Sequence, residues 1–127
     1  MAQKIVIQPE GAVSPVGPYN HAVRIGDLLF CSGQIPLDPS TGKLVEGDTA
    51  AQARQVLKNV GIILKDQGLT FANVVKSTIF LTDLADFASV NGVYAESFTN
   101  DFPARSTIQV AALPLGAHVE IEVIAHF

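Results

Sequence analysis

TAAQARQVLKNVGIILKDQ, residues 49–67, is the most regular segment of this 127-residue chain. Its apolar residues recur at the spacing of one buried helical face: Ala53, Val56, Leu57, Val60, Ile63 and Leu64. Thr49 and Gln52 match a capping box, in which each side chain binds the other's free backbone N–H. Gly68 is typical of the residue that follows a helix. The segment therefore predicts an amphipathic helix that packs one face against a core.

A second helix is predicted over residues 86–98. Its apolar face is formed by Phe87, Val90, Tyr94 and Phe98. Asn91 comes four residues after Phe87 and three before Tyr94, so it shares that face. A polar amide on an apolar face has two explanations: a hydrogen-bonded amide of the core, or a group that supports a ligand site.

Six β-type segments accompany these helices. They are rich in β-branched and apolar residues and are bounded by turn residues: residues 4–8, 22–25, 28–33, 74–82, 105–111 and 118–126. Gly26-Asp27 joins the second segment to the third as a tight hairpin. The order predicts one α+β domain over residues 1–127, in which both helices cover one face of a mixed sheet.

The side chains of the last two strands alternate between the faces of this sheet. One apolar face of residues 118–126 carries Val119, Ile121, Val123 and Ala125. Glu120 and Glu122 point to the other face, and Arg105 shares a face with Thr107. We expect Arg105 to lie with Glu120 and Glu122 on the face without helices. In a chain with few charges, that face is a candidate assembly surface.

The composition is that of a folded protein. Apolar residues make up 48% and charged residues 16%, which excludes intrinsic disorder and favours burial against other copies. The net charge of −4 and the lack of a basic stripe argue against a nucleic-acid partner. Cys31 is the only cysteine, so no internal disulfide is expected. The sequence contains no signal-like or membrane-length apolar run, so we expect a cytoplasmic protein without a membrane partner.

Arg105 carries the most chemical information. It is the only Lys or Arg from Ser77 to Phe127, and a guanidinium among apolar residues requires a partner. That partner is either Glu120 or Glu122 of the same chain, or the carboxylate of a small ligand held by two hydrogen bonds. Glu120 in turn is either a solvated strand residue or a carboxylate that orients or deprotonates water.

Several common catalytic patterns are absent from the sequence. Ser32 lies in Phe-Cys-Ser-Gly-Gln, which lacks the Gly-x-Ser-x-Gly surroundings of a hydrolase nucleophile. His21, His118 and His126 do not have the spacing of metal ligands. Neither a phosphate-binding loop nor a dinucleotide fingerprint occurs. We therefore expect no metal, and pattern alone leaves the function open.

Six short motifs resemble those of the Rid family, also called the YjgF-like family. They occur in the family's order and extend over essentially the whole chain: Gly17-Pro18-Tyr19, Cys31-Ser32-Gly33-Gln34-Ile35-Pro36, Ala51-Gln52-Ala53-Arg54-Gln55, Val90-Asn91-Gly92-Val93-Tyr94, Phe102-Pro103-Ala104-Arg105-Ser106 and Val119-Glu120-Ile121-Glu122. The resemblance implies a chorismate-mutase-like α+β fold and a homotrimer. In such trimers the sheets form a central barrel, the helices lie outside, and clefts lie between subunits.

The resemblance also implies an activity. The chain is most similar to the RidA branch, enamine and imine deaminases that hydrolyse 2-imino acids released by pyridoxal-phosphate dehydratases. The products are a 2-oxo acid and ammonia, and no cofactor is needed. Carried over by position, Arg105 would bind the substrate carboxylate with the backbone N–H of Thr107, and Glu120 would orient water and move protons. The other cleft residues would be Tyr19, Ser32, Gly33 and Asn91.

The resemblance leaves alternatives open. The RidA branch often has Cys where this chain has Thr107, which leaves the preferred imino acid open. The dehydratase partner is either a threonine dehydratase or another enzyme. A non-catalytic trimer that binds 2-oxo acids, or regulates, through the same clefts is a second hypothesis, which Glu120→Ala would separate from an enzyme. A ribonuclease role, a label long attached to the family, conflicts with the net charge of −4.

Overall fold

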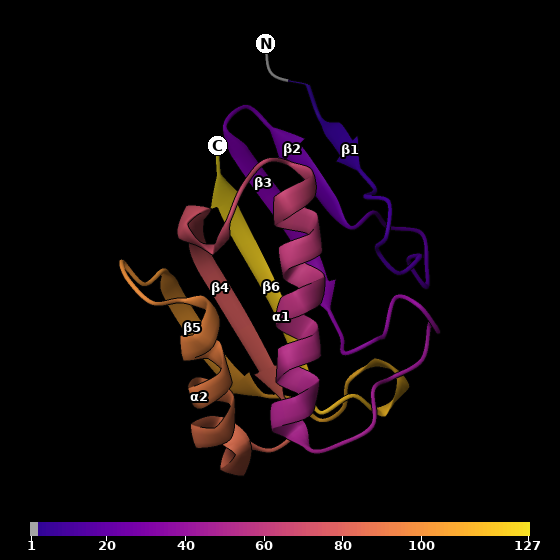
Figure 1. Ribbon diagram of the computed structural model, residues 1–127, viewed down its shortest axis with the longest axis vertical. Helices are drawn as coiled ribbons and strands as arrows, with labels where there is room; N and C mark the ends of the chain where they lie inside the picture. The colour runs from indigo at the N-terminus through magenta and orange to yellow at the C-terminus, as the bar shows by residue number, and fades with distance from the viewer. Residues whose placement is uncertain (1–2) are drawn as a thin grey trace.

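Two helices lie on one face of a six-stranded sheet in the computed structural model, which describes residues 3–127 (Figure 1). Met1 and Ala2, the start of the predicted domain, lie outside the described residues. The helices are α1 (Thr49–Asp66) and α2 (Phe87–Ser97), and the strands are β1 (Ile5–Ile7), β2 (Ala22–Ile25), β3 (Leu28–Gln34), β4 (Val74–Leu81), β5 (Ala104–Gln109) and β6 (Val119–His126). Three 3-10 turns connect them: η1 (Phe71–Asn73), η2 (Leu84–Asp86) and η3 (Pro114–Gly116). Within this described part, neither helix has the length and hydrophobicity to span a membrane.

The strands follow the order β1-β2-β3-β6-β4-β5, so the predicted mixed α+β architecture is confirmed. Neighbouring strands are antiparallel except β4 and β5, which run parallel. The predicted hairpin joins β2 to β3, and Gly26 in its turn has φ +56°, which glycine adopts without steric cost. β5 lies at an edge of the sheet, so one side of its backbone has no neighbouring strand.

The core lies between the helices and the sheet. The predicted face of α1 is at most 4% exposed throughout: Ala53, Val56, Leu57, Val60, Ile63 and Leu64. The inner face of β6 is at most 2% exposed: Val119, Ile121, Val123 and Ala125. Burying one Val, Leu or Ile side chain contributes about 1.5–3 kcal/mol. These two patterns therefore hold the layers together.

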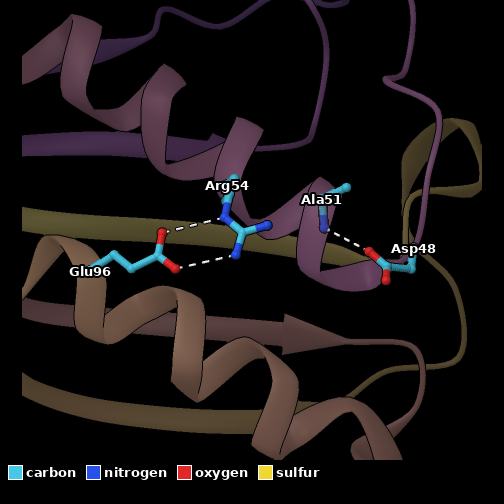
Figure 2. A network of polar contacts seen from close by, with 4 residues as sticks. All are labelled: Asp48, Ala51, Arg54 and Glu96. Atoms are coloured by element: carbon cyan, nitrogen blue, oxygen red, sulfur yellow. Dashed lines mark hydrogen bonds and ion pairs between the residues drawn. The ribbon is translucent and has the colours of Figure 1, made fainter.

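The N-terminus of α1 differs from the prediction. The capping residue is Asp48, whose carboxylate accepts a 2.9 Å hydrogen bond from the N–H of the third helical residue (Figure 2). The predicted capping box of Thr49 and Gln52 is wrong, because both side chains are buried in tertiary hydrogen bonds. The Thr49 hydroxyl donates to Asp86 Oδ2 at 2.9 Å, and Gln52 Oε1 accepts from the His118 N–H at 2.8 Å.

Arg54 of α1 and Glu96 of α2 form a two-point ion pair across the helices (Figure 2). The Nη2–Oε2 distance is 3.2 Å, and both side chains are more than half exposed. Exposed pairs of this kind contribute about 0–1 kcal/mol to stability. The ion pair therefore lies on the outer surface of the two helices, away from the sheet.

Arg105 and Thr107 lie on the helix-covered face of the sheet. Arg105 pairs with Ser77 of β4, and Thr107 pairs with Ile79. Residues paired across neighbouring strands point to the same face, and both β4 residues are 0% exposed beneath the helices. The two β5 side chains therefore point toward the α2 layer.

Glu120 and Glu122 lie on the opposite, helix-free face. They pair with Phe80 and Thr78, which alternate with the buried residues of β4. The prediction that Arg105 shares a face with these two carboxylates is therefore wrong. Alternation within each strand was predicted correctly, but the phase between strands follows from the pairing of both strands with β4.

Candidate active site

Arg105 is held against aromatic rings of α2. Its guanidinium carbon lies 4.9 Å from the ring centre of Tyr94 and 5.7 Å from that of Phe87. A 2.6 Å hydrogen bond between the Tyr94 hydroxyl and Ser77 Oγ fixes the nearer ring. Burial raises the pKa of Tyr94, so its phenol stays neutral at physiological pH. Cation–π attraction thus holds the guanidinium beside these rings.

No carboxylate of the described residues pairs with Arg105. Across residues 3–127, the one ion pair within 4.0 Å joins Arg54 to Glu96. Glu120 and Glu122 project from the other side of the sheet. Of the two partners considered for Arg105, the internal carboxylate is therefore wrong. A half-buried guanidinium without a carboxylate partner is suited to binding the carboxylate of a ligand through two hydrogen bonds.

A cavity of about 320 Å³ opens beside this guanidinium. Its walls come from α2 and from the segment that leads into β5: Asn91, Tyr94, Ala95, Phe102, Pro103 and Arg105. Asn91 is half-buried in this wall, so it is not a fully buried core amide, and its role in a site stays a prediction. Sequence reasoning missed Phe102, which is 70% exposed. Its signal was its place in the Phe102-Pro103-Ala104-Arg105 motif.

Thr107 presents its backbone N–H at the open edge of the sheet. Val110 N–H donates a 2.8 Å hydrogen bond to the Leu81 carbonyl, so alternate residues of β5 face β4. In parallel pairing the residues between them turn their N–H groups away from the neighbouring strand. Thr107 is one of these, as is Arg105. The Thr107 N–H is therefore not used in the pairing with β4, and its role in substrate binding stays a prediction.

Glu120 lies against the backbone of Gly33. A Cβ atom on Gly33 would come within 2.8 Å of Glu120 Cδ and closer still to Oε2. Real Cβ atoms do not approach neighbours this closely, so only glycine leaves room for the carboxylate in this position. The structure therefore brings together two of the predicted site residues, Gly33 and Glu120, from adjacent strands β3 and β6.

The environment of Glu120 favours proton transfer. Burial raises the pKa of its carboxyl, and the neighbouring Glu122 carboxylate raises it further. A carboxyl with a raised pKa exchanges protons closer to neutral pH than an ordinary glutamate does. Glu120, with Glu122 beside it on this face, is therefore suited to binding a water molecule and exchanging protons with it.

Tyr19 and Ser32 lie beside Gly33. Tyr19 and Gly33 line one narrow cavity of about 20 Å³. The Ser32 hydroxyl donates a 2.6 Å hydrogen bond to the Asn20 carbonyl, so it can only accept from a ligand. Ser32 thus acts as a fixed polar wall, which agrees with the lack of a hydrolase nucleophile pattern in the sequence.

The predicted site residues form two groups. The guanidinium group contains Arg105, Asn91 and Thr107, on the helix side and at the β5 edge. The carboxylate group contains Glu120, Gly33, Ser32 and Tyr19, around β3 and β6. Because Arg105 and Glu120 point to opposite faces of the sheet, the expected single cleft is not complete within one chain.

Among residues 3–127, the remaining reactive side chains form no second centre. Burial raises the pKa of the Cys31 thiol to about 12, so it stays protonated and inert at neutral pH. Throughout residues 3–127, no group of three or more His, Cys, Asp or Glu side chains is placed to hold a metal ion.

Known proteins resemble this chain over nearly its whole length. The family described as Endoribonuclease L-PSP matches residues 10–127. The human 2-iminobutanoate/2-iminopropanoate deaminase is 49% identical over 120 residues, which cover 94% of this chain and 88% of the human protein.

Solved structures give the same result. A Rid-family protein of unknown function from Yersinia pestis is 49% identical with a TM-score of 0.95, covering 98% of this chain and 100% of that one. E. coli TdcF, solved with bound serine, is 41% identical with a TM-score of 0.91, covering 97% of this chain and 98% of its own. The matched region contains both groups of site residues, from Tyr19 to Glu120. This chain therefore belongs to the endoribonuclease L-PSP family, the family of the Rid (YjgF-like) proteins.

Proposed function

We propose that this protein is an imine deaminase, which hydrolyses 2-imino acids to 2-oxo acids and ammonia. The observation that carries the proposal is the guanidinium of Arg105, held over Tyr94 beside an apolar cavity and without a carboxylate partner among residues 3–127. A 2-imino acid offers both a carboxylate for the guanidinium and a small side chain for the cavity. The human relative that bears the name of such a deaminase supports the same substrate class.

The reaction needs positioning more than chemical activation. Arg105 and the Thr107 N–H hold the substrate carboxylate, and Glu120 holds a water molecule over the C=N carbon. Glu120 takes one proton from the water as the water oxygen bonds to the carbon of the protonated imine and the C=N electron pair moves to nitrogen. Glu120 passes that proton to the nitrogen, the C–N bond breaks as an oxygen lone pair forms the C=O bond, ammonia leaves, and the remaining hydroxyl proton passes to Glu120. No covalent bond to the protein forms.

The active cleft belongs to a homotrimer in this proposal. Arg105 and Glu120 point to opposite faces of one sheet, so a cleft that contains both takes the guanidinium group from one copy and the carboxylate group from the next. Three such contacts close a ring. The exposed apolar side chains support this assembly, since Phe30 on β3 is 43% exposed and Ile108 on β5 is 45% exposed.

A coupled assay tests the proposed reaction. A threonine dehydratase releases 2-iminobutanoate in the presence of semicarbazide, which traps the imine. The wild-type protein should divert the imine to 2-oxobutanoate, whereas Arg105→Ala should not. Arg54→Ala is the matched control, because Arg54 lies on the outer helix surface. The proposal is wrong if the wild type diverts no imino acid from threonine or serine dehydratases.

Ligand-binding and RNA-cleavage measurements on the same variants distinguish two other functions. A non-catalytic trimer that binds 2-oxo acids would give no diversion but would retain affinity in Glu120→Ala. An RNA-cleaving protein would show cleavage that falls steeply with salt and disappears in Arg105→Ala, yet the net charge of −4 disfavours an RNA partner. Residues 1–127 are one catalytic domain in this proposal, and a cytoplasmic location stays a prediction from the lack of a signal-like or membrane-length apolar run in the sequence.

A further inference from the structure

We propose that His21 and Gln34 are positioning residues for the deaminase reaction. Their buried pair holds the irregular part of β3, at Ser32 and Gly33, against which the Glu120 carboxylate lies. The inference rests on the proposed function for its kinetic consequence. Neither residue touches the reacting atoms in this proposal.

β3 contains a bulge at Ser32 and Gly33. The pairing of β3 with β6 is regular up to Cys31 and resumes at Gln34 after a shift in register. Ser32 and Gly33 together stand opposite Glu122 alone, and such a bulge leaves backbone groups without their ladder partners. Some other group must fix the backbone here, because Gly33 itself contributes no side chain to pack.

Gln34 supplies that group. Its side chain is 7% exposed and folds back over the bulge, where Nε2 donates a 3.2 Å hydrogen bond to the Ser32 carbonyl. The same nitrogen donates to Nδ1 of His21, also at 3.2 Å. Both hydrogens of the amide are therefore used, one on the bulge and one on the imidazole.

The partners of His21 define the hydrogen-bonding role of each ring nitrogen. Nε2 lies against the Val13 carbonyl, which can only accept, so Nε2 carries a hydrogen. Nδ1 faces the amide nitrogen of Gln34, which can only donate, so Nδ1 is an acceptor. Both ring nitrogens are therefore paired within a side chain that is 5% exposed.

The pair joins the bulge to the loop that carries Tyr19. The His21 carbonyl accepts a 2.8 Å hydrogen bond from the Ser32 N–H. His21 and Gln34 line the same small cavity as Tyr19 and Gly33. One buried unit thus fixes both walls of the carboxylate group of the site.

The consequence for chemistry follows from the contact of Gly33 with Glu120. The carboxylate occupies space that even one methyl group on Gly33 would close. A change in the bulge therefore moves the group that holds the attacking water, while Arg105 and the substrate carboxylate are untouched. A loosened bulge should lower kcat much more than it raises KM.

Three variants separate the two halves of this pair. Gln34→Met keeps the shape and removes both donors, so kcat should fall about 10- to 100-fold with KM nearly unchanged. His21→Asn keeps an acceptor at the place of Nδ1 and should retain most of kcat. His21→Gln keeps a donor toward Val13 but lacks that acceptor. Its kcat should therefore fall about as much as that of Gln34→Met.

The control for simple loss of stability is Val60→Ala. Val60 is fully buried in α1 and distant in the chain from the bulge. Each kcat is measured at a temperature where circular dichroism shows every variant folded. Equal kcat per folded molecule in Gln34→Met and Val60→Ala would overturn the positioning role.

A measurement without turnover separates this inference from the proposed function. Carbon-13 NMR of the Glu120 carboxyl gives its pKa directly in the wild type and in each variant. Burial in the wild type disfavours the charged form of the Glu120 carboxyl and so raises its pKa. Gln34→Met should lower that pKa, because a loosened bulge admits water to the carboxyl. An unchanged Glu120 pKa would refute the inference even if no imino acid were hydrolysed. A shifted pKa without turnover would support the positioning role and reject the deaminase.

Discussion

The carboxylate of Glu120 occupies the space where any other residue at position 33 would place its Cβ. On Gly33, that atom would lie 2.8 Å from Glu120 Cδ. Because Gly33 has no side chain, it leaves space for the carboxylate of Glu120 on the neighbouring strand. This relationship links the Cys31-Ser32-Gly33-Gln34 motif to the chemistry of the carboxylate group of the site.

Gly33→Ala should reduce kcat about 10- to 100-fold with little loss of stability. The clash is with the flexible end of a side chain, so Glu120 moves and the fold persists. Gly61→Ala is the matched control, because its Cβ would make an ordinary 3.5 Å contact with Phe71. That control should keep full activity and gain about 0.5–1 kcal/mol of stability. Steady-state kinetics and thermal unfolding of both variants check the prediction.

Arg105→Lys should raise KM for 2-imino acids about 10- to 100-fold, since the planar two-point contact is lost, a change of about 1.5–3 kcal/mol. The positive charge is kept, so charge alone does not account for the effect. Arg54→Lys, on the exposed ion pair with Glu96, should leave KM unchanged. An Arg105→Lys enzyme with wild-type KM would show that Arg105 does not bind the carboxylate in the assumed geometry.

Thr107→Val should retain kcat/KM within about threefold and raise stability by about 1 kcal/mol. The hydroxyl Oγ1 is buried without a hydrogen-bond partner among the described residues, and the proposed role uses only the backbone N–H. Thr107→Cys should behave similarly in activity. Thermal unfolding and kinetics with several imino acids provide the measurement. A large loss of kcat/KM in both variants would instead assign the hydroxyl itself a role in substrate binding.

The pH profile should show an acid limb set by Glu120. The reaction needs the carboxylate, so kcat falls as the pH drops through the pKa of Glu120, which burial and then Glu122 raise above the ordinary value. Glu122→Gln removes the second cause and should move the acid limb to lower pH. A limb that stays in place in Glu122→Gln, or moves upward, would contradict the assignment of Glu120 as the titrating group.

Mixed assemblies should restore activity from two inactive variants. If each cleft takes Arg105 from one copy and Glu120 from the next, Arg105→Ala and Glu120→Ala trimers are each inactive. Random mixing of the two chains during refolding then gives about a quarter of the clefts both intact residues. Activity near that level, with a trimer mass by light scattering, is the expected result. Mixtures without activity would place both residues in one copy's cleft.

The sequence by itself determined the elements and their inner faces. The apolar spacing of α1 and the alternation of β6 are local properties with periods of 3.6 and 2 residues, and both faces are buried as predicted. The hairpin at Gly26 follows equally from local turn chemistry. The residue types of the site were also readable, because Arg105 and Glu120 stood out against few charges and lay within recognisable motifs.

Tertiary structure alone decided which side chains of different strands share a face of the sheet. Whether Arg105 and Glu120 share a face depends on the register of two strands that both pair with β4, and no local pattern encodes that register. The capping of α1 by Asp48 and the contact of Glu120 with Gly33 could likewise not be predicted from the sequence pattern. Each arises where segments far apart in the chain compete for the same hydrogen bonds or the same space.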